Sequence, residues 1–214
     1  MKRCIFVCMT VAVVFGSSVA LVWADDLYQP PWLRFDPHTN TTYQNWTFET
    51  SANPSTPDQG IYNLYGIPEA TITQGTWLSN WDQHAGVWIL GSGSSMDLYV
   101  PNTPYDATKH KDLWTQITWE PNGDNAAPVV IVNGIPISTP IFTVSVGNTG
   151  WFQSVYETTL VPNPAAEDLV ITGNYYLGEV VVDTQCVPEP STLALLAMGA
   201  LGLAAFIWRR KQSA

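Results

Sequence analysis

The chain has 214 residues, of which 12% are charged and 12% aromatic, and its formal net charge is −10. The segment between residues 25 and 187 contains seventeen acidic side chains and only three cations, so it carries a net charge of −14. The three cations are Arg34, Lys109 and Lys111. Because sequence-independent nucleic-acid binding needs cations that neutralise phosphates, that class of function is excluded. Neutral glycans, cationic partners and divalent cations remain compatible with the charge, which also favours solubility.

The first 24 residues have the layout of a signal peptide. A cationic start precedes an apolar run, and small residues then lead to Ala24 and the acidic pair Asp25-Asp26. This order predicts export with cleavage after Ala24, and cleavage after Ala20 is the alternative.

Cysteine usage sets a limit on how the exported part is stabilised. Cys4 and Cys8 lie within the predicted signal peptide, so Cys186 is the one cysteine left between residues 25 and 187. An internal disulfide is therefore excluded, and Cys186 either is buried at the end of a strand or forms a link between molecules.

Residues 25–187 have the composition of a single all-β domain. Val, Ile, Thr, Tyr and Trp are frequent, with Gly, Pro, Asn and Asp between the apolar stretches. The pattern predicts an antiparallel β-sandwich or jelly roll, with a turn at 91–95 and a hairpin at Asn133-Gly134. The expected strands are 43–50, 61–66, 70–81, 86–90, 96–100, 113–119, 129–132, 135–137, 142–146, 151–160, 169–172 and 179–183.

Tryptophan is the most distinctive residue of this domain, with eight of the ten tryptophans between residues 25 and 187. Aromatic rings either fill a core or stack on sugar rings, while carboxylates and amides bind hydroxyls. The densest cluster runs from Trp77 to His84, and Trp114 lies on the strand face opposite to Leu113. The candidate glycan-contact residues are therefore Trp77, Trp81, Asp82, Gln83 and Trp114.

Metal and catalytic signals are weak. Oxygen-rich loops around Asp124, Asp97 and Asp106 would suit calcium, but the spacing matches no known calcium loop and ordinary turn chemistry explains it. Neither a zinc-ligand pattern nor a nucleophile or phosphate-binding motif occurs, so we assign no catalytic residue, metal ligand or cofactor. A jelly-roll glycosidase or lyase, which needs one pair among the many carboxylates, is the alternative to a non-enzymatic protein.

The C-terminal end of the chain has three parts. Pro188, Glu189 and Pro190 form a helix-breaking segment, residues 192–208 form an uncharged apolar run, and Arg209, Arg210 and Lys211 follow. As a helix the run spans about 25 Å, which predicts a short transmembrane helix. Under the positive-inside rule the basic residues stay in the cytoplasm and the domain lies outside.

Together these three parts resemble the PEP-CTERM sorting signal of Gram-negative bacteria, over residues 187–214. The resemblance implies recognition by an exosortase near Pro188-Glu189-Pro190, passage through the inner membrane, and delivery to the cell envelope or extracellular matrix. Such proteins are commonly associated with exopolysaccharide.

We therefore divide the chain into a signal peptide (1–24), an ectodomain (25–187) and a sorting signal (188–214). The expected function is that of a non-enzymatic envelope or matrix protein that contacts exopolysaccharide. The alternatives are the carbohydrate-active enzyme or a purely structural, self-associating surface protein.

Overall fold

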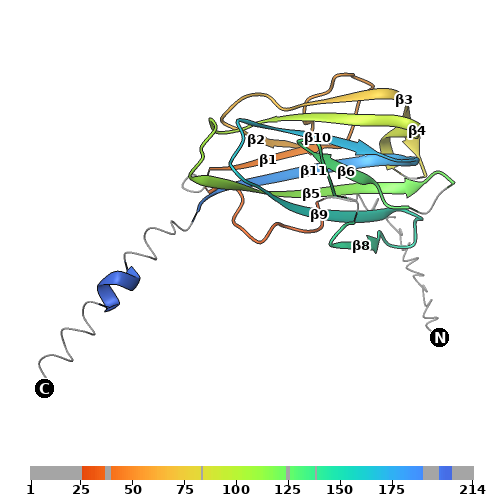
Figure 1. Cartoon of the computed structure of the whole chain (residues 1–214). Coiled ribbons are helices and arrows are strands. Elements are labelled where there is room, and N and C mark those ends of the chain that lie inside the picture. The colour runs from red at the N-terminus through yellow and green to blue at the C-terminus, as the bar shows by residue number, and fades with distance from the viewer. Residues whose placement is uncertain are drawn as a thin grey trace, which may run out of the picture.

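The computed structural model of the chain describes residues 26–36, 40–82, 84–123, 126–137, 139–189 and 198–203 (Figure 1). These residues form strands joined by antiparallel pairings into one sheet. The all-β, antiparallel prediction is confirmed. The strands are β1 (Thr41–Trp46), β2 (Gly60–Tyr62), β3 (Glu69–Trp81), β4 (His84–Pro101), β5 (Lys109–Pro121), β6 (Val129–Val132), β7 (Ile135–Ile137), β8 (Phe142–Ser145), β9 (Phe152–Leu160), β10 (Ala166–Thr172) and β11 (Tyr175–Pro188).

The sheet curls into two facing layers that share β4 and β11 as their junction. The first layer has the order β8-β9-β5-β11-β1-β2, and the second has the order β3-β4-β10-β6-β7. The first residues of β11 pair with β4, and the rest of that edge pairs with β1. The other edge of β11 pairs with β5 along its whole length. β11, which is the last strand along the chain, is therefore the strand on which the two layers meet.

The expected turn at 91–95 is wrong, because the chain passes through it within the single strand β4. Thr73 of β3 pairs with Ser95, whereas Gly75 pairs with Leu90, so four residues of β4 face Gln74 alone. The Ser94 hydroxyl stabilises this wide bulge by donating to the Gln74 carbonyl at 2.8 Å. Bulges bend a strand strongly, and here the bend lies where β4 exchanges its partner β11 for β10.

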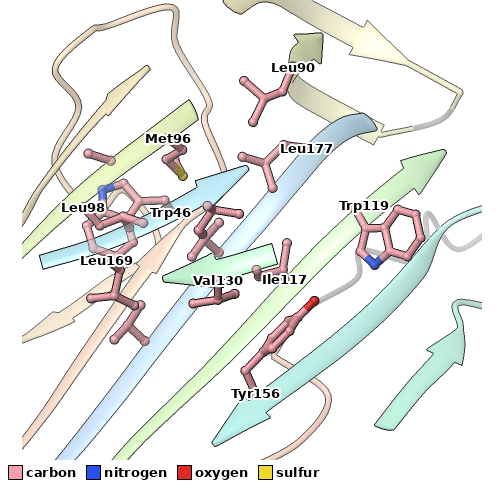
Figure 2. Close-up of a cluster of buried hydrophobic side chains, with 14 of the residues drawn as sticks. Trp46, Leu90, Met96, Leu98, Ile117, Trp119, Val130, Tyr156, Leu169 and Leu177 are labelled. Carbon is pink, nitrogen blue, oxygen red and sulfur yellow. The ribbon is translucent and has the colours of Figure 1, made fainter. Parts of the chain in front are cut away.

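The core lies between the two layers (Figure 2). On β5 the alternation is as predicted, since Leu113, Ile117 and Trp119 point inward and are almost completely buried. Burial of such side chains contributes roughly 1.5–3 kcal/mol each to the stability of the domain. From the other strands the cluster includes Trp46, Leu90, Met96, Leu98, Val130, Tyr156, Leu169 and Leu177.

The outer face of the first layer is covered by residues 26–36, which we call the N-terminal strap. The backbone N–H of Tyr28 donates to Gln116 Oε1 at 3.0 Å, and Gln116 Nε2 donates to Asp26 Oδ1 at 2.8 Å. Farther along the strap, Arg34 donates to Asp183 on β11. The strap therefore bridges β5 and β11 on the face away from the core.

The two ends of the chain lie largely outside the described residues. These include the predicted signal peptide, Pro190 and the basic residues 209–211, together with most of the expected transmembrane helix. Residues 198–203 are helical, and Figure 1 shows them apart from the sheet. Across the described ranges, no helix reaches the length and apolar character needed to cross a bilayer.

Candidate functional site

Among the tryptophans in the described ranges, Trp81 has the largest exposure, at 37%. It is the last residue of β3, at the end of the sheet where β3 turns into β4. Trp46, Trp88, Trp114, Trp119 and Trp151 are buried. Most of the tryptophans therefore stabilise the fold, and Trp81 is the one best placed to meet a ligand.

The indole of Trp81 is held in a fixed orientation by two contacts, and we call Trp81, Tyr176 and Glu120 the aromatic platform. One face of the indole stacks on Tyr176, with 4.3 Å between ring centroids and 9° between planes. Its Nε1 donates to Glu120 Oε2 at 2.7 Å. Tyr176 and Glu120 are cross-strand partners on β11 and β5, so the sheet register places one group against the face of the indole and the other at its Nε1 edge.

The electrostatics of the platform centre on Glu120. Burial raises the pKa of its carboxyl, the hydrogen bond from Trp81 opposes that rise, and the charge of Asp82 adds to it. Gly150 passes close by, since a Cβ at that position would lie 3.3 Å from Glu120 Oε1. The carboxylate therefore sits in a tight, partly desolvated position while it orients the ring.

A ring with one covered face, one fixed edge and a large exposed area is suited to stacking on a flat apolar surface. Sugar rings present such a surface through their C–H groups, and the electron-rich face of an indole attracts them. The carboxylates of Glu120 and Asp82 are acceptors for hydroxyl groups. Because Trp81 is already oriented, a ligand that binds there does not have to order it.

The other sequence candidates are not all brought to this place. Trp77 is half-buried, and its Nε1 donates to the Phe48 carbonyl at 3.0 Å. Asp82 is exposed in the turn after Trp81. Gln83 lies outside the described residues.

Trp114 does point to the outer face of the first layer, as the alternation of its strand predicts. That face is covered by the N-terminal strap, and Trp114 Nε1 donates to the Tyr28 carbonyl at 3.3 Å. Trp114 is only 7% exposed, so it offers no open ring face to a ligand.

A second exposed ring lies on the outer face of the second layer. Tyr99 is 49% exposed and pairs with Glu69 on β3 and Asp168 on β10, so three side chains share that face. Within the described ranges it has no stacked ring partner of the kind that holds Trp81. This position provides a natural comparison for the platform.

The oxygen-rich loops do not converge on one point. Asp97 accepts from the Ser95 hydroxyl within β4, and Asp106 accepts from the Thr108 hydroxyl in the loop before β5. Asp124 and Asn125 lie outside the described residues. Over the parts of the chain that the structure describes, no group of three or more His, Cys, Asp or Glu side chains is arranged to hold a metal ion.

Glu120 and Tyr176 were not among the residues selected from the sequence. Trp81 and Glu120 are 39 residues apart, and Tyr176 comes from the last strand of the sheet. No local spacing links them, because they meet only through the pairing of β11 with β5. A carboxylate directly after an inward-facing Trp119, at the end of a strand, was the one weak signal available.

A buried polar cluster lies at the other end of the sheet. Lys111 and Glu167 are both fully buried, with 3.9 Å between Nζ and Oε1. Asn102 donates to Glu167 Oε1 at 2.8 Å, and burial raises the pKa of Glu167 to about 7. The Cys186 thiol lies 3.1 Å from Asn163 Oδ1 and is buried, which agrees with the strand-end interpretation of this cysteine.

The segment Pro188-Glu189-Pro190 begins inside the folded domain. Pro188 is the last residue of β11 and pairs with Lys109. The backbone N–H of Glu189 then donates to the Thr108 carbonyl at 2.9 Å. The chain therefore leaves the sheet at this segment without an intervening linker.

The model of the PEP-CTERM protein-sorting motif matches residues 187–211. The chain carries a PEP-CTERM sorting signal. This confirms the resemblance inferred from the sequence and indicates an exported protein of the kind that an exosortase sorts to the cell surface. The match leaves the ectodomain unassigned, and no curated protein matches the chain.

Solved structures share only a distant likeness with this PEP-CTERM protein. A family 35 carbohydrate-binding module from Clostridium thermocellum is 17% identical, with a TM-score of 0.39 over 53% of this chain and 90% of that one. An exo-β-1,3-galactanase from Phanerochaete chrysosporium is 13% identical, with a TM-score of 0.34 over 57% of this chain and 34% of that one. A tailspike protein of bacteriophage CBA120 is 12% identical, with a TM-score of 0.24 over 69% and 19% of the two chains.

Proposed function

We propose that this PEP-CTERM protein is a non-enzymatic component of the cell envelope or extracellular matrix that contacts exopolysaccharide through the aromatic platform. Residues 1–24 direct export, residues 192–208 hold the chain in the inner membrane, and an exosortase processes it near Pro188-Glu189-Pro190. The basic residues 209–211 keep the tail end in the cytoplasm.

The orientation of Trp81 is the observation that supports glycan contact. Its indole is exposed, yet Tyr176 and the Glu120 carboxylate fix it from two sides. An exposed apolar ring that served only packing would not need both contacts. The acidity of the ectodomain adds a constraint, since a neutral polysaccharide is a better ligand than an anionic one.

Binding of the full-length chain, reconstituted in nanodiscs, to a glycan array and to isolated exopolysaccharide tests the proposal. We expect Trp81→Ala to lower the affinity about 5- to 150-fold, if a sugar ring stacked on the indole contributes about as much as a stacked nucleobase does, about 1–3 kcal/mol. Tyr99→Ala is the matched control, since it removes an exposed ring from the other layer. Absence of binding with and without calcium would refute glycan contact, and loss of binding in Tyr99→Ala alone would move the site to the second layer.

Glu120 also gives one reason to test the enzymatic alternative. A carboxyl whose pKa is raised by burial, beside a second acid and an exposed aromatic ring, has the character of a general acid in glycoside hydrolysis. An enzyme would show turnover on a polysaccharide that Glu120→Gln abolishes while binding remains. A binding protein would show no turnover, and Glu120→Gln would only weaken binding.

A further inference from the structure

Three loops meet at the end of the sheet from which the tail leaves. Asn63 donates to the Pro101 carbonyl at 2.8 Å, and Asn102 donates to Asn163 Oδ1 at 2.9 Å, so the loops contact one another through β4. β11, the last strand before the tail, ends here (Figure 1). We call the loops 63–68, 102–108 and 161–165 together the exit loops.

The exit loops expose large apolar side chains. Each loop contributes at least one of them, and their exposed fractions lie between 62% and 73%. A single exposed apolar residue is ordinary, but a group at one end of a domain marks a contact surface. The residues are Leu64, Ile67, Tyr105 and Val161.

The exit loops are also almost free of charge, although the ectodomain is strongly acidic. Loops 63–68 and 161–165 contain no charged residue, and loop 102–108 contains Asp106 alone. Lys109 pairs with Asp106, with 3.3 Å between Nζ and Oδ2. Of the seventeen acidic side chains of the ectodomain, the exit loops therefore contain one, and it is paired with a cation; the exposed Glu69 and Glu189 border the loops at the start of β3 and after β11.

The number of residues between the folded domain and the apolar run limits how far the exit loops can lie from that run. Glu189, whose backbone N–H donates to Thr108, is the last described residue before the apolar run, and in the sequence only residues 190 and 191 separate it from that run at 192–208. An extended chain advances about 3.3–3.6 Å per residue, so the start of the run lies within roughly 11 Å of Glu189. The headgroup layer of a bilayer is about 5–8 Å thick on each side.

We propose that the exit loops form a lipid-contact surface that rests in the headgroup layer of the inner membrane while the tail is inserted. This proposal rests on the membrane insertion of residues 192–208 in the proposed function. Uncharged loops with exposed Leu, Ile and Tyr side chains partition favourably into that layer, whereas the acidic remainder of the ectodomain stays in water. The surface would orient the domain and hold Pro188-Glu189-Pro190 at the level of the membrane surface.

An environment-sensitive fluorophore on single cysteines of the full chain tests this surface. The three native cysteines are first removed by Cys4→Ser, Cys8→Ser and Cys186→Ser. The chain is then reconstituted in phosphatidylcholine/phosphatidylglycerol vesicles that contain no other protein. Leu64→Cys, Ile67→Cys and Tyr105→Cys report on the exit loops, and Met198→Cys reports on the tail. Asn148→Cys, in an exposed turn at the opposite end, is the matched control.

We expect blue-shifted emission and quenching by headgroup-level nitroxide lipids at the three loop positions, and aqueous spectra at position 148. Leu64→Glu and Ile67→Glu, which change exposed side chains, should return the label at position 105 to an aqueous spectrum. Aqueous loops beside a lipid-buried label at position 198 would overturn lipid contact and leave a protein as the occupant of this end. Aqueous spectra at both the loops and position 198 would refute tail insertion, and this proposal with it.

Discussion

Arg34 and Asp183 lie 149 residues apart in the chain, yet Arg34 Nη2 donates to Asp183 Oδ2 at 2.6 Å. The same guanidinium pairs with Asp26 and lies over the ring of Tyr43, 4.7 Å from its centroid. Both side chains of the Arg34–Asp183 pair are nearly inaccessible to solvent. This contact joins the segment after the predicted signal peptide to the strand before the sorting signal.

Arg34→Met should destabilise the domain by about 3 kcal/mol near pH 8, because it leaves the carboxylate of Asp183 buried without its partner. Burial raises the pKa of Asp183 to about 7 even with Arg34 present. The loss of stability in Arg34→Met should therefore become smaller as the pH falls and Asp183 takes up a proton. Urea unfolding of the variant at pH 5 and pH 8 measures both effects.

The double variant Arg34→Met/Asp183→Asn is the control for this prediction. It removes the buried charge together with its partner, so most of the stability at pH 8 should return. Equal destabilisation of the single and double variants would show that packing of the strap, and not charge, is what matters.

Glu167 should make the domain less stable as the pH rises. Its folded pKa of about 7 is above the usual value near 4.5, so the folded state holds more protons than the unfolded state between these values. The free energy of unfolding then falls with rising pH across this window, by up to about 1.4 kcal/mol per pH unit for one group. Glu167→Gln should thus gain stability relative to the parent between pH 5 and pH 8.

Thermal and urea unfolding at four pH values in that interval measure the difference. Glu157→Gln, an exposed site on β9, should leave the slope of the parent unchanged. If the free energies of unfolding of Glu167→Gln and of the parent changed with pH in the same way, Glu167 would be ionised in the folded state.

Gly86 should tolerate no side chain. Its φ is +70°, and a Cβ would overlap the carbonyl group of Phe48. We expect Gly86→Ala to cost about 3 kcal/mol or more, from the left-handed backbone and the clash together. Gly134→Ala, with φ +79° but open space around it, should cost about 1 kcal/mol in the same denaturation experiment.

Replacement of Pro188, Glu189 and Pro190 by alanine should leave export intact and hold the protein in the inner membrane. The reason is that the apolar tail remains while the recognition segment is lost. Membrane fractionation and the size of the mature chain measure the outcome, with Ser191→Ala as the neighbouring control. If the triple-alanine variant still left the inner membrane normally, the tail would be an ordinary membrane anchor and not a sorting signal.

Local pattern was enough to predict most strands and the facing of several side chains. The alternation in β5 placed Leu113 and Ile117 inward and Trp114 outward, and Asn133-Gly134 predicted the β6–β7 hairpin. For residues 91–94 the sequence predicts a turn where the structure has a bulge, because glycine and serine are typical of both and only the partner strand distinguishes them.

The aromatic platform was only partly predictable. Trp81 stood out by composition, but whether a tryptophan is buried depends on which strand covers it, and that is set by distant pairing. Glu120 and Tyr176 come together because of the register of β11 on β5, which no short window of sequence contains.

The position of β11 has a consequence for the order of events during export. Chains cross the membrane from the N terminus onward, and β11 is the strand that joins β1, β4 and β5. On the proposed export route we therefore expect the two layers to join only after the last stretch before the sorting signal has emerged, because such long-range pairings form slowly. Under the proposed insertion of residues 192–208, closure of the domain coincides with arrest of the tail in the bilayer, and the newly folded protein is then positioned for processing near Pro188-Glu189-Pro190.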